Sequence, residues 1–221
     1  MKITKYNQAC LLIETNGKRI LVDPGNIGYT DEMYEKEWKN IDYILVTHKH
    51  NDHCYAEVIN KIVVRDDAKL YTTYEVLESQ PLYGVNVIKA GDIIDDKIIK
   101  IYVTKAVHGY LPVMKNKEVK ENVGYIIDDG EKRIYITSDT IGFDNNYKCN
   151  ILCMPFNGNG LTLGIVDGVL FAKQTEAKLV IPIHMQHPNP IMNPDINILK
   201  KTLEENNIEY KILGINESIE I

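Results

Sequence analysis

Residues 47–54 read THKHNDHC and directly follow the apolar run IDYILV at residues 41–46. The window holds three of the six histidines of the chain, together with Asp52. Imidazole and carboxylate groups are the ligand types that zinc prefers and that manganese and iron accept. The window therefore indicates part of a metal site, and a chance cluster on the surface is the alternative.

The sequence on either side places the window in a turn between a strand and a helix. The β-branched run before it is typical of a buried strand, and YAEVINKIV at residues 55–63 has the apolar spacing of a helix. His48 and His50 lie two residues apart, so an extended segment puts both side chains on one side. Asp52 and His53 fall near the start of the helix. These four side chains provide about half of the ligands that a two-metal site needs.

The remaining sequence predicts two groups of strands with helices between them. Asn-Gly at residues 16–17 favours a tight turn that joins the flanking strands as an antiparallel hairpin, and DDGEK at residues 128–132 is a second turn signal. Strands are expected at residues 2–15, 18–25, 41–48, 68–73, 92–96, 97–108, 122–129, 132–139, 150–156, 177–184, 209–213 and 217–221, and helices at residues 31–40, 55–63, 73–79, 163–174 and 194–206. No linker or short repeat interrupts the pattern. The sequence predicts a single α/β (α+β) domain over residues 1–221, in which helices cover two mainly antiparallel or mixed sheets.

Composition argues against several classes of protein. Hydrophobic residues make up 44% and charged residues 25% of the 221 residues, as in an ordinary folded protein. A formal net charge of -6 argues against nucleic acid as a partner. The first residues lack the continuous apolar run of a secretory signal, and no segment approaches a membrane span, so we expect a cytoplasmic protein without a membrane partner. The four cysteines form no C-x-x-C pair and are expected to be buried thiols.

The segment THKHNDH at residues 47–53 resembles the T-H-x-H-x-D-H motif of the metallo-β-lactamase superfamily. That resemblance implies a four-layer αββα sandwich and three further ligands in a fixed order along the chain. His108 ends KIYVTKAVH, Asp139 follows the strand RIYIT, and His184 ends KLVIPIH, so each expected ligand has a candidate. Taken singly, either histidine would more often be an ordinary half-buried side chain, and Asp139 would fit a helix N-cap.

The family roles can be carried over position by position. The resemblance implies that one metal is held by His48, His50 and His108, that the other is held by Asp52, His53 and His184, and that Asp139 bridges the two. Asp23, in LVDPG, matches an early aspartate motif of the family and is expected to support the ligand loop by hydrogen bonds. A turn residue before Pro24 is the alternative for Asp23.

The implied cofactors are two divalent metal ions, with zinc preferred over manganese or iron. Two such ions share a water molecule and lower its pKa toward roughly 7, which yields hydroxide without a separate strong base. Asp52 is the expected catalytic residue, because it can orient the nucleophile or accept its proton as well as bind metal. The implied activity is hydrolysis of a small-molecule lactone or ester, and a phosphodiester or other phosphoester is the alternative substrate.

Other segments are similar to the compact hydrolase branch that includes the L-ascorbate-6-phosphate lactonase type. The segment at residues 155–163 departs from the glycine pair and Thr-Met usual in that branch, which leaves substrate placement open. A mononuclear iron persulfide dioxygenase using His48, His108 and Asp139 is a less favoured alternative. A non-catalytic metal-binding protein is another.

Candidate substrate contacts follow His108 and His184. Tyr110 could face the substrate, and His187 could donate a proton to a leaving group. Lys115, Lys117 and Lys120 could attract an anion, although a solvated loop is the preferred interpretation of that segment. We expect Cys54 to be a packing residue. The expected partner is a small-molecule substrate, and the sequence leaves homo-oligomer formation open.

Overall fold

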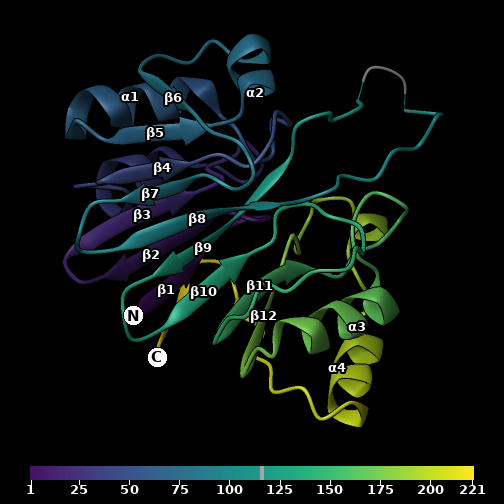
Figure 1. Cartoon of the computed structure of the whole chain (residues 1–221). Helices are drawn as coiled ribbons and strands as arrows, with labels where there is room; N and C mark the ends of the chain where they lie inside the picture. The colour runs from purple at the N-terminus through teal and green to yellow at the C-terminus, as the bar shows by residue number, and fades with distance from the viewer. Residues whose placement is uncertain (115–116) are drawn as a thin grey trace. The chain divides into compact units, whose positions relative to one another are not determined.

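The computed structural model describes residues 1–114 and 117–221, and these form two units (Figure 1). The first unit consists of residues 1–89 and 214–221, and the second of residues 90–213. Each unit contains one β-sheet with its own helices. The expected mixed α/β class with two sheets and covering helices is confirmed. The assignment of all 221 residues to a single domain stays a prediction.

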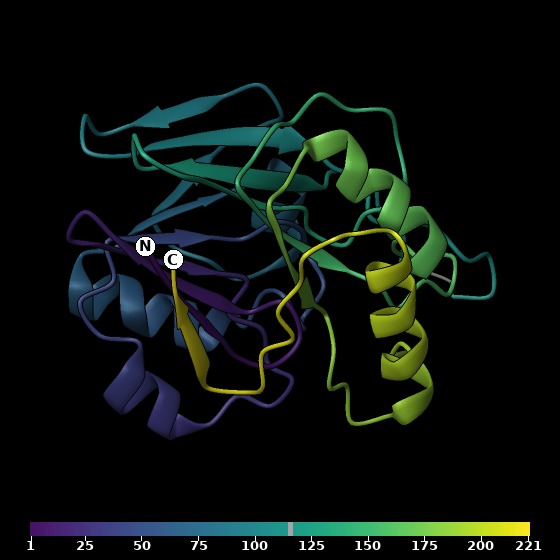
Figure 2. The same cartoon turned by 90° about the horizontal axis from the view of Figure 1, so that it is seen from below.

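The sheet of the first unit has seven strands in the order β13-β1-β2-β3-β4-β5-β6. Neighbouring strands from β13 to β3 in this order pair antiparallel. Neighbouring strands from β3 to β6 pair parallel. The elements of this unit are β1 (Lys2–Lys5), β2 (Leu11–Thr15), β3 (Lys18–Val22), a π-helical turn η1 (Met33–Glu37), β4 (Tyr43–Leu45), α1 (Ala56–Asp66), β5 (Lys69–Thr72), α2 (Tyr74–Ser79), β6 (Val85–Val87) and β13 (Glu217–Glu220). Figure 2 shows the two ends of the chain side by side, where β13 pairs with β1.

The predicted hairpin turn is present between β2 and β3. Asn16 and Gly17 have φ angles of 48° and 75°, the left-handed conformations that a tight hairpin turn requires. The single strand expected over residues 2–15 is wrong, because the chain reverses at residues 6–10 and β1 pairs antiparallel with β2. Gln8 has a φ of 53° within that reversal, a conformation that an extended strand excludes.

Strand register brings three loops to one edge of this sheet. Leu11 pairs with Val22, Val22 with Leu45, and Leu45 with Tyr71. The loops that follow β1, β3 and β4 therefore emerge at the same edge, and the loop after β4 carries THKHNDHC. On one face of the sheet, α1 buries Val58, Ile59 and Ile62 in an apolar core that fixes the end of that loop.

Lys5 is an unusual member of this sheet, because its side chain is fully buried. Its amine donates a hydrogen bond to the Tyr6 carbonyl at 2.9 Å, and burial lowers the pKa of the amine from 10.5 to about 8. Below about pH 8 the amine is charged in both the folded and the unfolded chain, so burying the charge lowers the free energy of unfolding. Between pH 8 and 10.5 only the unfolded chain keeps the proton, and this contribution makes the free energy of unfolding rise with pH.

We expect Lys5→Met to raise the free energy of unfolding at pH 7 by up to about 3 kcal/mol. The gain should shrink as the pH is raised toward 10, because wild-type Lys5 then becomes neutral. Denaturant unfolding of both proteins over that range measures the difference. Lys2→Met, which changes a partly exposed lysine of the same strand, is the control and should show no such trend. A gain that does not vary with pH would contradict the assignment.

The sheet of the second unit has six strands in the order β12-β11-β10-β9-β8-β7. Its elements are β7 (Ile93–Asp95), β8 (Lys100–Lys105), β9 (Val123–Asp128), β10 (Arg133–Ile136), β11 (Ile151–Pro155), α3 (Ile165–Thr175), β12 (Leu179–Ile183), a short 3-10 helix η2 (Pro190–Met192) and α4 (Ile196–Glu205). In Figures 1 and 2 α3 and α4 lie side by side, and their apolar residues share one core with β11 and β12. β10, β11 and β12 run parallel and β8 has the same direction, so the loops after these four strands leave at one edge.

Two further differences from the expected strands lie at residues 209–213 and at β6. The strand expected at residues 209–213 is wrong, because only Tyr210 forms a bridge, with Val180. Pro182 follows on β12 and has no N–H to continue the ladder. The short strand β6 was not predicted, because its three residues include an asparagine and give too weak an alternation. Within residues 1–114 and 117–221, no helix has the length and apolar character needed to cross a membrane.

Candidate metal centre

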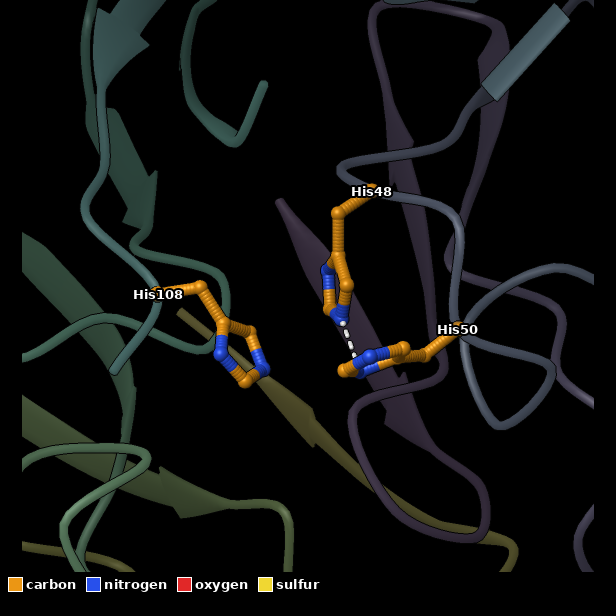
Figure 3. Close-up of side chains that lie close together, drawn as sticks. All are labelled: His48, His50 and His108. Carbon is orange, nitrogen blue, oxygen red and sulfur yellow. Dashed lines mark hydrogen bonds between the residues drawn. The ribbon is translucent and has the colours of Figure 1, made fainter. Parts of the chain in front are cut away.

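The first unit places four of the predicted ligands in the loop between β4 and α1. His48 Nε2 lies 3.2 Å from His50 Nδ1, the contact that is drawn as a dashed line in Figure 3. His53 Nε2 lies 3.7 Å from Asp52 Oδ2. His48 and His53 are fully buried, whereas His50 and Asp52 are partly exposed. The loop therefore brings together three imidazoles and a carboxylate, which are donors suited to a divalent metal.

Asp23 supports this loop with three hydrogen bonds. Asp23 Oδ1 accepts from the backbone N–H of Thr47 at 2.8 Å. Asp23 Oδ2 accepts from the Thr47 hydroxyl at 2.8 Å and lies 2.7 Å from His53 Nδ1. The side chain is fully buried, and Asp23, which directly follows β3, has a left-handed φ of 48°. Its position joins the ends of β3 and β4, and it orients the first and last parts of the ligand loop.

These contacts decide which nitrogen of two imidazoles is protonated. An ionised carboxylate only accepts, so His53 Nδ1 carries the proton that binds Asp23. The Thr47 hydroxyl donates its proton to the hydrogen bond with Asp23, so it accepts from His48 Nδ1 at 3.0 Å. In both rings Nε2 then carries the lone pair, and that of His48 lies 3.2 Å from His50 Nδ1. This pattern, with one ring nitrogen fixed by an acceptor and the other left as a donor atom, is the usual arrangement of metal-binding histidines.

The backbone around the ligand loop is closely packed. A Cβ on Gly25 would lie 1.8 Å from the backbone oxygen of Asp52, so only glycine fits at this position. Asn26 N–H donates to the Asn51 carbonyl at 2.8 Å. Cys54 is buried in the apolar core, and burial, assisted by the nearby Asp23 charge, raises the pKa of its thiol to about 12. Cys54 is thus a protonated packing residue.

The second unit brings together the other three predicted ligands. His184 Nε2 lies 3.0 Å from Asp139 Oδ2, and His108 Nε2 lies 4.0 Å from the same oxygen. His108 Nδ1 lies 2.7 Å from the Gly109 carbonyl, which can only accept, so the ring presents an Nε2 lone pair. Asp139 and His184 are buried, and they come from the ends of β10 and β12. The edge of the second sheet thus carries two imidazoles around one carboxylate.

Polar residues behind these ligands fix their positions. Asn157 Nδ2 lies 3.0 Å from His184 Nδ1, and Asn157 Oδ1 accepts from the Thr162 hydroxyl at 3.0 Å. The Thr140 hydroxyl, next to Asp139, accepts from the Val107 N–H at 2.9 Å, next to His108. Sequence reasoning missed Thr140 and noticed Asn157 only as a departure from the family. Their positions depend on loop contacts that residue spacing does not reveal.

Gly109 adjoins His108 at a close approach of two loops. A Cβ added to Gly109 would lie 2.0 Å from the Gly160 carbonyl oxygen, whereas one added to Gly142 would meet its nearest atom at 3.7 Å. We expect Gly109→Ala to displace His108, to lower metal affinity by about 10-fold or more and to cost about 1–3 kcal/mol of stability. Gly142→Ala is the control and should change neither property by much. Equal metal affinities of the two variants would contradict this account.

The predicted substrate contacts lie on the surface loops of the second unit. Tyr110 is 50% exposed, Lys117 is exposed and Lys120 is exposed, while Lys115 lies outside the described residues. The roles of Tyr110 and of these lysines toward a substrate stay predictions.

His187 is partly exposed, and its Nδ1 accepts from the Asn189 N–H at 3.0 Å. The neutral ring therefore carries its proton on Nε2. The role of His187 as a proton donor to a leaving group stays a prediction.

The chain is similar to proteins described as metal-dependent hydrolases and metallo hydrolases. Residues 2–184 match the family described as the Beta-lactamase superfamily domain. A UPF0173 metal-dependent hydrolase of Bacillus thuringiensis (strain Al Hakam) is 30% identical over 233 residues, covering 99% of each chain. Among solved structures, a metallo hydrolase from the archaeon Ignicoccus hospitalis KIN4/I superposes with a TM-score of 0.79 at 23% identity, covering 99% of this chain and 97% of the other. An isothiocyanate hydrolase from Delia radicum gut bacteria gives 0.78 at 21% identity, covering 100% and 99%. The metallo-β-lactamase fold expected from the sequence is confirmed.

Proposed function

We propose that the two ligand clusters of this chain together hold two divalent metal ions. The premise is that the chain belongs to the beta-lactamase superfamily and is a metal-dependent hydrolase. In this proposal one metal is bound by His48, His50 and His108, the other by Asp52, His53 and His184, and Asp139 bridges them. The observation that carries the proposal is the tautomer of three imidazoles. His48, His53 and His108 each have Nδ1 fixed by an acceptor, which leaves Nε2 as the donor atom.

The proposed metal is zinc. Five imidazoles and two carboxylates form a nitrogen-rich donor set without thiolate, which zinc accepts well. Manganese and iron bind the same ligand types, so the donor set alone does not reject them. Divalent metals, when bound, supply an activated water and take up negative charge on the substrate oxygen.

The residues of the chain would then divide the work of hydrolysis. Asp52 is partly exposed, and its carboxylate can accept the proton of the nucleophile as well as bind metal. Asp139 lies deeper and would hold the two clusters together through its carboxylate. Asp23 orients His53 and Thr47 and touches no reacting atom in this scheme.

The proposed substrate is a small-molecule lactone or ester, and a phosphodiester is the second candidate. Support for the first comes from the resemblance to the L-ascorbate-6-phosphate lactonase type. Support for the second comes from the exposed Lys117 and Lys120 on the loop after His108, which would attract an anion. The isothiocyanate hydrolase among the solved structures adds one further carbon electrophile to the compounds worth testing.

The function is tested by assaying metal-reconstituted protein against lactones, esters, thioesters, phosphodiesters and an isothiocyanate. We expect metal-dependent cleavage of a lactone or ester, and none after chelation. Cleavage of phosphodiesters alone would favour the second candidate. Oxygen uptake with a persulfide would favour a mononuclear iron enzyme, and full metal loading without any hydrolysis would contradict the lactone or ester assignment.

A further inference from the structure

Asn122 joins the two residues of a strained turn that presents Asp139. The turn follows β10, and Asn122 immediately precedes β9, its antiparallel partner. Asn122 Oδ1 accepts from the Ser138 hydroxyl at 2.6 Å, and Asn122 Nδ2 donates to the Asp139 carbonyl at 2.8 Å. Both functional groups of one amide are therefore used, each on a different residue of the turn.

The turn needs such support because its backbone conformation is unfavourable. Ser138 has a φ of 66°, in the left-handed region that is unfavourable for a residue other than glycine. The turn is also buried, with Ser138 fully inaccessible and Asp139 and Asn122 almost so. Without the amide, the Ser138 hydroxyl and the Asp139 carbonyl would each lose a buried hydrogen bond, and both bonds hold the turn in this conformation.

The direction of this turn decides where the Asp139 carboxylate lies. Asp139 Oδ2 is within 3.0 Å of His184 Nε2 and 4.0 Å of His108 Nε2. A rotation of the peptide at Ser138 would swing the carboxylate away from both rings. The Asn122 amide opposes that rotation, because turning the peptide breaks both of its hydrogen bonds together.

We propose that Asn122 is a positioning residue that sets the metal affinity of the site by fixing the turn of Asp139. This inference rests on the proposed function, in which Asp139 is a metal ligand. Asn122 contacts the backbone of Asp139 and not the carboxylate that would bind metal. Loss of such a support behind a metal ligand typically lowers affinity 10- to 100-fold.

The test compares Asn122→Ala with Asn150→Ala. Asn150 Oδ1 accepts from the Arg133 N–H at 2.8 Å, so it makes a similar bond between side chain and backbone at the opposite end of β10. Zinc affinity is measured by competition with a chromophoric chelator, the absorption spectrum is recorded with cobalt(II), and thermal midpoints are measured without metal. We expect both variants to lose thermal stability. Only Asn122→Ala should lose zinc affinity, by about 10- to 100-fold, with a changed cobalt spectrum.

A milder variant keeps the test valid should Asn122→Ala fail to fold. Ser138→Ala removes the hydroxyl but keeps the bond from Asn122 to the Asp139 carbonyl, so we expect a smaller loss of zinc affinity than for Asn122→Ala. A wild-type zinc affinity and cobalt spectrum in Ser138→Ala, and in Asn122→Ala where that variant folds, would overturn the inference. Failure of the wild-type protein to bind zinc or cobalt would instead overturn the proposed function on which it rests.

Discussion

Replacing Asp52 or His50 by alanine should abolish hydrolysis without unfolding the chain. Each change removes one proposed metal ligand, and we expect a loss of transition-state stabilisation on the order of 4 kcal/mol, or about a thousand-fold in rate. Both side chains are partly exposed and lie outside the apolar core, so their removal should cost little stability. The measurements are metal content, hydrolysis of the substrate found in the panel, and the thermal midpoint.

Lys49 provides the matched control for these variants. It lies between the ligands in the same loop, but its amine pairs with Glu75 at 2.7 Å. Lys49→Ala should therefore keep the metal and the activity. The scheme fails for Asp52 and His50 if their variants retain full metal content and hydrolysis.

Replacing Asp23 by alanine should have the largest effect on stability among these residues. The change leaves the Thr47 N–H, the Thr47 hydroxyl and the His53 Nδ1–H without their acceptor in a fully buried environment. We expect a loss of about 3–5 kcal/mol in the free energy of unfolding. Metal affinity should also fall by about 10- to 100-fold, because His53 loses the partner that fixes its tautomer.

Asp42 provides the comparison for Asp23. It also accepts from a backbone N–H, that of Arg19 at 2.9 Å, but it lies at the opposite end of β3 and β4 and is partly exposed. Asp42→Ala should cost about 1 kcal/mol and leave metal affinity unchanged. Denaturant unfolding of metal-free protein and zinc titration separate the two effects. An Asp23→Ala protein as stable as Asp42→Ala would contradict the supporting role.

The ligand loop was predictable because its chemistry lies in adjacent residues. His48, His50, Asp52 and His53 form a dense motif, and a buried strand and a helix on either side predict a turn without reference to the rest of the fold. The early motif around Asp23 was predictable only through resemblance to the family. Local sequence does not show that its carboxylate reaches both Thr47 and His53.

The supports of the second cluster could not be predicted in this way. Asn122 was expected at the start of a strand, and Thr140 and Asn157 just beyond the ends of two others. Their roles arise where strands that are distant in sequence end at one sheet edge. The extent of a strand also depends on the neighbouring strand with which it can form hydrogen bonds. Pro182 limits the pairing of Tyr210, and a three-residue strand such as β6 forms because β5 offers it an edge.

The most direct test of the central claim is the anomalous scattering of zinc in crystals of the zinc-loaded protein. We expect two zinc peaks: one bounded by His48, His50 and His108, the other by Asp52, His53 and His184, with Asp139 touching both. Well-ordered crystals that show no zinc peak at these residues, or zinc only elsewhere on the chain, would contradict it.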